Sequence, residues 1–366
     1  MYEAVFAGKI SGNGKFTAKC QQYLQGRFGF GKALLTNSCT DALEMAALLL
    51  KIQPGDEVIM PSYTFVSTAN AFVLRGAKII FADSRPDHPG MDEANIRSLL
   101  SPHTKAIVVM HYAGVACDMD AIMELAQAHG LYVVEDAAQA IDSYYTGRDG
   151  KQRALGAFGH LAAFSFHESK NIISGEGGML AINDWQFEER AVLLWEKGTN
   201  RIAFFKEEVD RYQWMDIGSS FSPSDMTAAF LYAQLENLDD IQARRRLLWN
   251  RYDSHFRGLL DEQYQVKLPQ IPPYASNNAH MYYLLCRSGD ERERLITLLR
   301  QQGIMALFHY LPLHSSPFYK DIWKGVALPH ADHYAACLLR LPLFYELSEE
   351  LQLQVIDSVL AFYQGI

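Results

Sequence analysis

Lys170 is the residue of this sequence best placed to carry out covalent chemistry. It follows the small and apolar run 161–166, which predicts a buried strand, and it precedes a glycine-rich loop at 175–178. Burial disfavours the charged ammonium, so a lysine at a strand end can lose its proton well below the usual pKa of about 10.4. Such an amine can attack a carbonyl and form a Schiff base. Because most loop lysines are simply solvated, the assignment depends on the residues that accompany Lys170.

Asp136 and Gln139 follow another apolar run, at 132–135. In open α/β sheets, ligand groups come from the carboxyl ends of strands. The Asp136 carboxylate can therefore hold a cationic ring nitrogen by a charge-assisted hydrogen bond, while Gln139 donates to a neighbouring ring oxygen. The alternative is that Asp136 only caps a helix.

Two further stretches suit a flat, phosphorylated cofactor. Thr40 and Asp41 lie where a predicted strand meets the helical pattern 42–50, and free N–H groups at a helix start favour a phosphate. Ordinary helix capping is the alternative there. Phe65 follows a third strand, where it can stack on a ring or belong to the core. A lysine, an aspartate, a phosphate-binding helix start and a stacking aromatic ring are together the parts that bind pyridoxal phosphate.

Other features of the sequence argue against a metal site, disulfides, a nucleic-acid partner and a membrane span. The two histidines His309 and His314 are separated by Pro312 and make a poor metal pair, so we expect them to face a ligand or to be structural. The five cysteines show no CxxC spacing and predict neither zinc nor disulfides. The net charge of −9 argues against a nucleic-acid partner. No apolar run is long enough to cross a membrane and the start lacks a signal-peptide pattern, so we expect a cytoplasmic protein.

The elements that must position these residues alternate between strands and helices. Strands are predicted at 32–35, 57–60, 78–82, 106–110, 132–135, 161–166 and 179–182. Helical patterns fill the gaps, for example at 118–129, and one long helix is predicted at 222–252. This alternation predicts an α/β fold with a largely parallel sheet.

The pattern changes near residue 250. A strand at 281–286 and helices at 291–302 and 348–363 predict a small α+β domain. We therefore expect a large cofactor-binding domain over 1–250 and a small C-terminal domain over 251–366.

The sequence also resembles the DegT/DnrJ/EryC1/StrS family of sugar-nucleotide aminotransferases over nearly its whole length. The resemblance is carried by Ser38-Cys39-Thr40, Gln53-Pro54-Gly55-Asp56-Glu57-Val58, Pro61-Ser62-Tyr63-Thr64-Phe65, Glu135-Asp136-Ala137-Ala138-Gln139, Ser165-Phe166-His167 with Lys170-Asn171, Gly175-Glu176-Gly177-Gly178, Lys197-Gly198-Thr199-Asn200-Arg201, Asp216-Ile217-Gly218-Ser219-Ser220 and His309-Tyr310-Leu311-Pro312-Leu313-His314. It implies the fold-type-I architecture of enzymes that depend on pyridoxal 5'-phosphate.

The resemblance assigns roles to individual residues. Lys170 would form the Schiff base, Asp136 would pair with the pyridine nitrogen, Gln139 would lie beside the ring hydroxyl and Phe65 would stack on the ring. The phosphate would be held by Thr40, Asp41 and Ser165, with Ser220 supplied by the other subunit of a homodimer with shared active sites. The substrate would contact His309, Tyr310 and Arg201.

The resemblance also implies the substrates. L-glutamate would donate the amino group, and the acceptor would be a dTDP-linked keto sugar, dTDP-4-keto-6-deoxy-D-glucose, converted to dTDP-4-amino-4,6-dideoxy-D-galactose. A 3-ketosugar nucleotide is an alternative acceptor, because pocket shape chooses the carbon. A non-enzymatic regulator that retains the cofactor is an alternative of another class. A sugar dehydratase is disfavoured because the family's dehydratases carry histidine in place of Lys170.

Three features depart from the family pattern. The N-terminal region is about a dozen residues shorter than is common, Asp41 replaces a small residue, and the segment 147–153 is slightly longer. Asp41 is therefore expected to offer its backbone N–H rather than its side chain to a phosphate.

Overall fold

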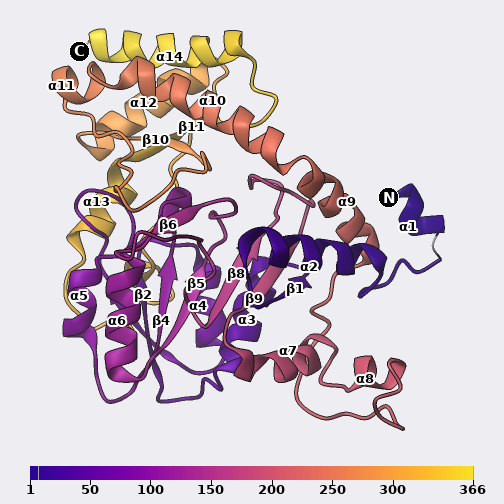
Figure 1. The fold of residues 1–366 in the computed structure, drawn as a ribbon. Coiled ribbons are helices and arrows are strands. Elements are labelled where there is room, and N and C mark those ends of the chain that lie inside the picture. Colours follow the sequence, from indigo (N-terminus) through magenta and orange to yellow (C-terminus); the bar gives the residue numbers. More distant parts are fainter. Residues whose placement is uncertain (7, 366) are drawn as a thin grey trace.

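A seven-stranded sheet forms the centre of the computed structural model, which describes residues 1–6 and 8–365 (Figure 1). Its strands, in spatial order, are β1 (Lys32–Thr36), β9 (Gly178–Ile182), β8 (Leu161–Ser165), β5 (Tyr132–Asp136), β4 (Thr104–Met110), β2 (Glu57–Pro61) and β3 (Lys78–Ala82). Only β9 runs against its sheet neighbours, β1 and β8. All seven predicted strands are present, and the predicted α/β class with a largely parallel sheet is confirmed.

Helices cover both faces of the sheet, which is why its central strands are buried on both sides. One face packs against α3 (Cys39–Leu49), α4 (Val66–Val73) and α7 (Glu188–Trp195). The other packs against α2 (Lys15–Phe28), α5 (Glu93–Leu99), α6 (Met119–His129) and α9 (Asp225–Glu236). Neighbouring residues of β1 show the alternation: Leu34 belongs to the first core, whereas Ala33 and Leu35 belong to the second.

The prediction of a single long helix at 222–252 is wrong. The structure has two helices, α9 and α10 (Leu238–Phe256), separated at Asn237. The Asn237 side chain donates a 2.8 Å hydrogen bond to the Ala233 carbonyl, which would otherwise lack a partner at the end of α9. Asparagine competes with helix continuation through such local bonds, and an apolar pattern does not reveal this competition.

A smaller set of elements lies beyond the sheet, around the C-terminal part of α10 (Figure 1). It contains the antiparallel pair β10 (Tyr282–Leu285) and β11 (Leu338–Leu341), with α11 (Leu260–Tyr264), α12 (Gly289–Gln301), α13 (Pro329–Cys337) and α14 (Glu349–Gln364). A third apolar core joins Trp249, Tyr252 and Phe256 of α10 to β10, β11, α11, α12 and α14, whereas the buried residues of α13 belong to the first core. The predicted domain boundary at 250 falls within α10.

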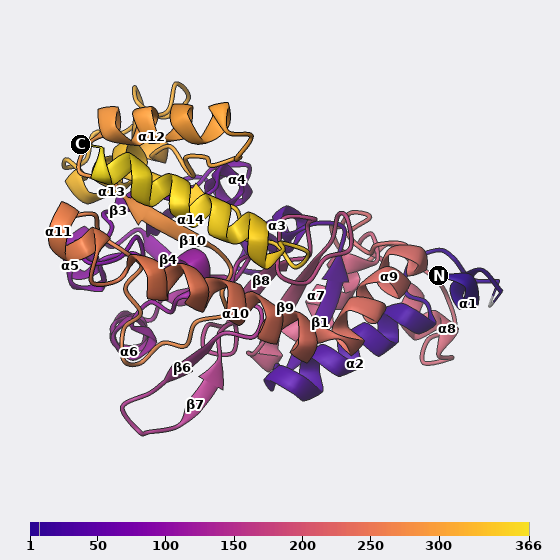
Figure 2. The ribbon, with the colours of Figure 1, turned by 90° about the horizontal axis from the view of Figure 1, so that it is seen from above.

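The remaining elements are short. They are α1 (Tyr2–Phe6), α8 (Arg201–Phe205), the hairpin of β6 (Tyr144–Thr146) and β7 (Gln152–Ala154), and three 3-10 turns, η1 (Tyr112–Gly114), η2 (Trp185–Phe187) and η3 (Leu313–Ser315). The segment 147–153 forms the tip of the hairpin, which projects away from the sheet in Figure 2. None of the helices in the described part of the chain has the length and apolar character of a membrane span.

Candidate active site

Lys170 lies in a tight loop directly after β8. The loop is closed by backbone hydrogen bonds from Phe166 to Gly177 and from Glu168 to Gly175, both 2.8 Å long. The lysine side chain is half-buried. Burial lowers the pKa of the Lys170 amine, and the neighbouring Cys39 and Asp136 raise it only in part. More of this amine is therefore neutral and nucleophilic than in an exposed lysine.

Asp136 ends β5 and is almost fully buried. The hydroxyl of Thr68 donates to its carboxylate at 2.6 Å, and the N–H of Ala138 donates at 3.1 Å. Both donors are neutral, and burial still raises the pKa of Asp136 although these bonds and Lys170 act to lower it. A buried carboxylate held by neutral groups is stabilised when a cation comes beside it. Asp136 thus fits the cationic ring nitrogen of pyridoxal phosphate.

The start of α3 forms the expected anion-binding turn. Ser38 is the N-cap and accepts a 3.1 Å hydrogen bond from the Asp41 N–H, so the alternative of ordinary capping is present in the structure. The Thr40 hydroxyl donates to Ser67 at 2.8 Å. Burial raises the pKa of the Asp41 carboxyl. Ser165 lies buried at the end of β8, where its hydroxyl accepts from the His167 N–H at 3.3 Å. These hydroxyls and amides fit a phosphate, and their role in holding it stays a prediction.

Two aromatic side chains from distant parts of the chain, Phe65 and Tyr310, lie near each other at the site. Phe65 precedes α4 and is 54% exposed, so its ring is available for stacking, at 6.2 Å from the Tyr310 ring. Gln139 donates a 2.7 Å hydrogen bond to the Tyr310 hydroxyl and accepts one of 2.6 Å from the Ala113 N–H. His309 stacks on Tyr310 with 3.6 Å between centroids. The structure thus brings Gln139 beside Tyr310 and its neighbour His309, although Gln139 lies 171 residues before Tyr310 in the sequence.

Arg201 and Ser220 are both exposed at the surface. Arg201 begins α8, is exposed, and lies 4.0 Å from the carboxylate of Glu196. Ser220 is also exposed, and its carbonyl accepts a 2.8 Å hydrogen bond from the Asn37 side chain, next to the start of α3. The contacts predicted for these two residues would be made with a substrate and with a partner subunit, and they stay predictions.

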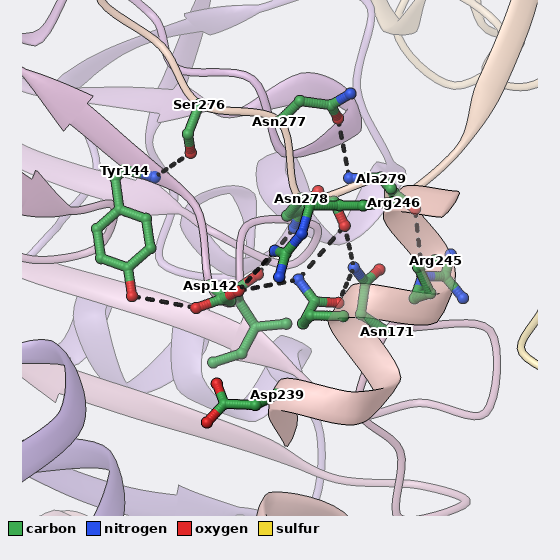
Figure 3. A network of polar contacts seen from close by, with 12 residues as sticks. Asp142, Tyr144, Asn171, Asp239, Arg245, Arg246, Ser276, Asn277, Asn278 and Ala279 are labelled. Carbon is green, nitrogen blue, oxygen red and sulfur yellow. Dashed lines mark hydrogen bonds and ion pairs between the residues drawn. The ribbon is translucent and has the colours of Figure 1, made fainter. Parts of the chain in front are cut away.

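Asn171, the residue after Lys170, belongs to a network of polar contacts (Figure 3). The Asn171 side chain donates to Gln242 of α10 at 2.9 Å and to the Asn278 carbonyl at 2.8 Å, and it meets His280 at 2.7 Å. Asn278 in turn donates to the carbonyls of Gln139 and Ile141, both at 2.8 Å. The loop of Lys170 is therefore fastened to α10 and to the segment that leads into β10.

Several supporting residues were not identified from the sequence. Thr68 and Ser67 reach the site from α4, Cys39 from α3, and Asn171 and His280 from the polar network. Asn171 had one available signal, a short polar side chain directly beside the reactive lysine. Thr68 had none, because its bond to Asp136 joins residues 68 positions apart.

Comparison with known proteins identifies this arrangement. A model of the DegT/DnrJ/EryC1/StrS aminotransferase family matches residues 1–360. The spore coat polysaccharide biosynthesis protein SpsC of Bacillus subtilis (strain 168) is 34% identical over 349 residues, which are 92% of this chain and 87% of SpsC.

Solved structures agree with this match. The aminotransferase TlmJ from Streptoalloteichus hindustanus has a TM-score of 0.89 at 30% identity, covering 100% of this chain and 94% of TlmJ. DesV from S. venezuelae, in complex with a ketimine intermediate, has a TM-score of 0.88 at 32% identity, covering 100% of this chain and 93% of DesV. Both the expected fold-type-I class and the family resemblance are confirmed, and the chain belongs to the DegT/DnrJ/EryC1/StrS aminotransferase family.

Proposed function

We propose that this aminotransferase moves an amino group from L-glutamate to a nucleotide-linked keto sugar, and that the sugar is dTDP-4-keto-6-deoxy-D-glucose. The amino-transfer chemistry rests on one observation, the pairing of Lys170 with Asp136. Lys170 is half-buried and has a lowered pKa, Asp136 is buried, and each of the two residues shifts the pKa of the other. The choice of a sugar is supported by SpsC, which is named for polysaccharide biosynthesis. The product would be dTDP-4-amino-4,6-dideoxy-D-galactose, as the resemblance of the sequence to the family implies.

The cofactor is pyridoxal phosphate, which supplies an electron sink for the carbon that loses its proton. The residues of this chain would transfer the proton and hold the cofactor in place. Nζ of Lys170 would take the proton from Cα of the donor, because its lowered pKa leaves more of the amine unprotonated than in an exposed lysine. Asp136 holds a proton on the ring nitrogen through its carboxylate, and Thr68 and Ala138 keep that carboxylate in place. The start of α3 orients the phosphate.

The same proposal includes a homodimer with shared active sites. The segment from α8 to Ser220 carries exposed apolar side chains, namely Phe204, Phe205, Val209, Tyr212, Trp214, Met215 and Ile217. Trp214 is 81% exposed and Phe205 is 70% exposed. A gathering of large apolar side chains on one exposed segment is typical of a protein interface. Ser220 lies at the end of this segment beside Asn37, so an interface at this segment would adjoin the phosphate-binding turn.

A panel of keto sugar nucleotides tests the substrate. Purified protein with pyridoxal phosphate and L-glutamate is offered dTDP-4-keto-6-deoxy-D-glucose, a 3-keto isomer, and the corresponding UDP sugar. We expect 2-oxoglutarate to form fastest with the dTDP-4-keto sugar, and NMR of the product to show an axial amino group at C4. Faster turnover of the 3-keto isomer would contradict the proposed position, and no turnover with any member would contradict the proposed sugar.

A further inference from the structure

Asn171 attaches the loop of Lys170 to the rest of the molecule. Among the described residues, it is the only one in the loop 166–177 whose side chain makes hydrogen bonds outside that loop. Its amide nitrogen donates to Gln242 of α10 at 2.9 Å and to the Asn278 carbonyl at 2.8 Å (Figure 3). Asn171 is 4% exposed, so these bonds are shielded from water. Because a peptide bond joins Lys170 to Asn171, the side-chain bonds of Asn171 also hold the lysine backbone.

The bond to Asn278 determines how His280 meets Asn171. A backbone carbonyl can only accept, so the Asn171 nitrogen must face Asn278 and the amide oxygen must face His280, at 2.7 Å from Nδ1. An amide oxygen only accepts as well, so Nδ1 of His280 carries a proton and donates it. Burial lowers the pKa of His280 well below its usual value, so the ring is neutral and has one N–H. His280 uses that single N–H on the residue beside the reactive lysine.

The backbone of His280 is held as well. Its N–H donates to the Asn278 side chain at 3.0 Å, and its carbonyl accepts from Arg245 of α10 at 2.7 Å. Asn278 also donates to the Gln139 carbonyl at 2.8 Å. One connected set of hydrogen bonds therefore joins the loop of Lys170, the helix α10 and the chain at Gln139.

We propose that Asn171 and His280 are positioning residues for Lys170, which set the direction from which its amine approaches the cofactor and the amino donor. The inference rests on the proposed role of Lys170 and adds the residues that keep it in place. An amine attacks a carbonyl carbon from a narrow range of positions, and an error of about 1 Å can slow the reaction roughly 100-fold. The lysine side chain is long and flexible, so its amine is placed accurately only if its backbone is held.

Two replacements of His280 differ in where they can place an N–H. The amide of asparagine lies at the same distance from the backbone as Nδ1 and can still donate to Asn171. The amide of glutamine lies one bond farther out, where Nε2 is, and cannot. Comparing His280→Asn with His280→Gln therefore tests the single bond to Asn171.

Both variants are measured first without cofactor. Competitive acetylation, read by mass spectrometry, gives the midpoint pH at which Lys170 becomes reactive, with the exposed Lys151 as the internal reference. Pyridoxal phosphate is then added, and the absorbance change gives the rate of its covalent attachment. We expect attachment to be roughly 10- to 100-fold slower in His280→Gln, and the midpoint of Lys170 to rise towards that of Lys151 because a released loop exposes the amine to water. His280→Asn should recover most of both losses.

Tyr363→Phe is the control for stability. It removes a buried hydroxyl that donates to Glu291 at 2.9 Å in the core of the small domain. This variant should unfold at lower urea concentration without changing the midpoint of Lys170 or the rate of attachment. If His280→Gln behaves in the same way, the network is only structural and the proposal is wrong. Equal losses in His280→Asn and His280→Gln would also overturn it, because the Nδ1–H bond would then not be the feature that matters.

A further variant covers the case in which His280→Gln does not fold. Gln242→Met keeps the volume and removes one acceptor of Asn171, so attachment should again be slower and the midpoint of Lys170 higher. Wild-type values for both in that variant would contradict the proposal. If the cofactor of the wild-type protein attaches to another lysine, the proposed role of Lys170 fails. The acetylation midpoints, read without cofactor, would still show whether the network places its amine.

Discussion

Two adjacent carboxylates at the end of β5 have opposite surroundings because successive side chains of a strand point to opposite faces. Glu135 is fully buried and accepts hydrogen bonds from the backbone N–H groups of Gly156, Phe158 and Gly159 at 2.6 to 2.8 Å. It also meets His111 at 2.9 Å. Asp136 instead has two neutral donors and faces Lys170. The first carboxylate therefore holds the fold, whereas the surroundings of the second fit its proposed role beside the cofactor.

Replacing each carboxylate by its amide separates these roles. Asp136→Asn should lower kcat by ~100-fold or more, about 2.7 kcal/mol of barrier, because the ring nitrogen is no longer held protonated. Glu135→Gln, the matched control, loses one acceptor and should lower the free energy of unfolding by about 1 to 3 kcal/mol, with a much smaller change in kcat. Steady-state kinetics and urea unfolding measure both quantities. Equal losses of kcat in the two variants would contradict this division of roles between Glu135 and Asp136.

The lowered pKa of Lys170 predicts how its reactivity depends on pH. Its amine should become reactive as the pH rises through a midpoint below the usual value of about 10.4. Asp136→Asn removes a negative charge that raises this pKa, so the midpoint should fall further. Competitive acetylation of the cofactor-free protein from roughly pH 7 to 11, read by mass spectrometry, gives the midpoint of each lysine. A midpoint for Lys170 equal to that of the exposed Lys151 would contradict the assignment.

The site residues that sequence could suggest are those that end strands. Lys170, Asp136 and Phe65 each follow an apolar run, and the carboxyl ends of parallel strands meet at one edge of a sheet. Thr68 gave no such signal, because its bond to Asp136 is a contact between distant segments of the chain.

At the scale of elements, the close approach of β9 to the start of α3 depends on Gly178. A Cβ there would overlap the backbone of Ser38 and Cys39, which lead into the phosphate-binding turn. No side chain can be accommodated unless the helix start moves away from the strand. The predicted glycine-rich loop thus also has a packing role.

Two glycine-to-alanine changes test whether the start of α3 depends on the absence of a side chain at Gly178. Gly178→Ala should lower stability by about 1 to 3 kcal/mol and weaken the binding of pyridoxal phosphate, because the turn is displaced. Gly26→Ala, within α2, meets nothing within 4 Å and should raise stability by about 0.5 to 1 kcal/mol without changing cofactor affinity. Unfolding curves and cofactor titration provide the readouts. Unchanged cofactor affinity in Gly178→Ala would show that the turn does not depend on this contact.

Strands were predicted better than helix ends for a physical reason. Each of the seven strands contains a short apolar run, and β2, β8 and β9 are buried along their whole length because both faces of the sheet are covered. The division between α9 and α10 depends on one side chain, Asn237, whose bond to Ala233 is a local competition rather than a periodic pattern.

At the scale of the whole molecule, α10 joins the sheet to the small domain. Gln242 in its first half contacts Asn171 beside the reactive lysine, and Tyr252 in its second half belongs to the small domain's core. The C-terminal elements are therefore linked through α10 to the loop of Lys170, and residues from both parts of the chain, such as Gln139 and Tyr310, meet at the site.

The exposed apolar side chains of the segment from α8 to Ser220 predict that the protein forms a homodimer. Trp214→Ser should weaken the homodimer by about 2 kcal/mol or more, roughly 30-fold in Kd, as for a central aromatic residue of an interface. Trp185→Ser is the matched control, because Trp185 is 83% exposed but lies on η2, outside that segment. Sedimentation equilibrium measures both. A wild-type protein that is monomeric and active at assay concentration would contradict the shared active site.

The central claim is that Lys170 carries the cofactor, and one measurement tests it most directly. Protein loaded with pyridoxal phosphate is reduced with borohydride, digested, and its peptides are mapped by mass spectrometry. The account predicts a single cofactor adduct on Lys170, and no adduct and no amino transfer in Lys170→Ala. An adduct on another lysine, or near-normal turnover by Lys170→Ala, would contradict it.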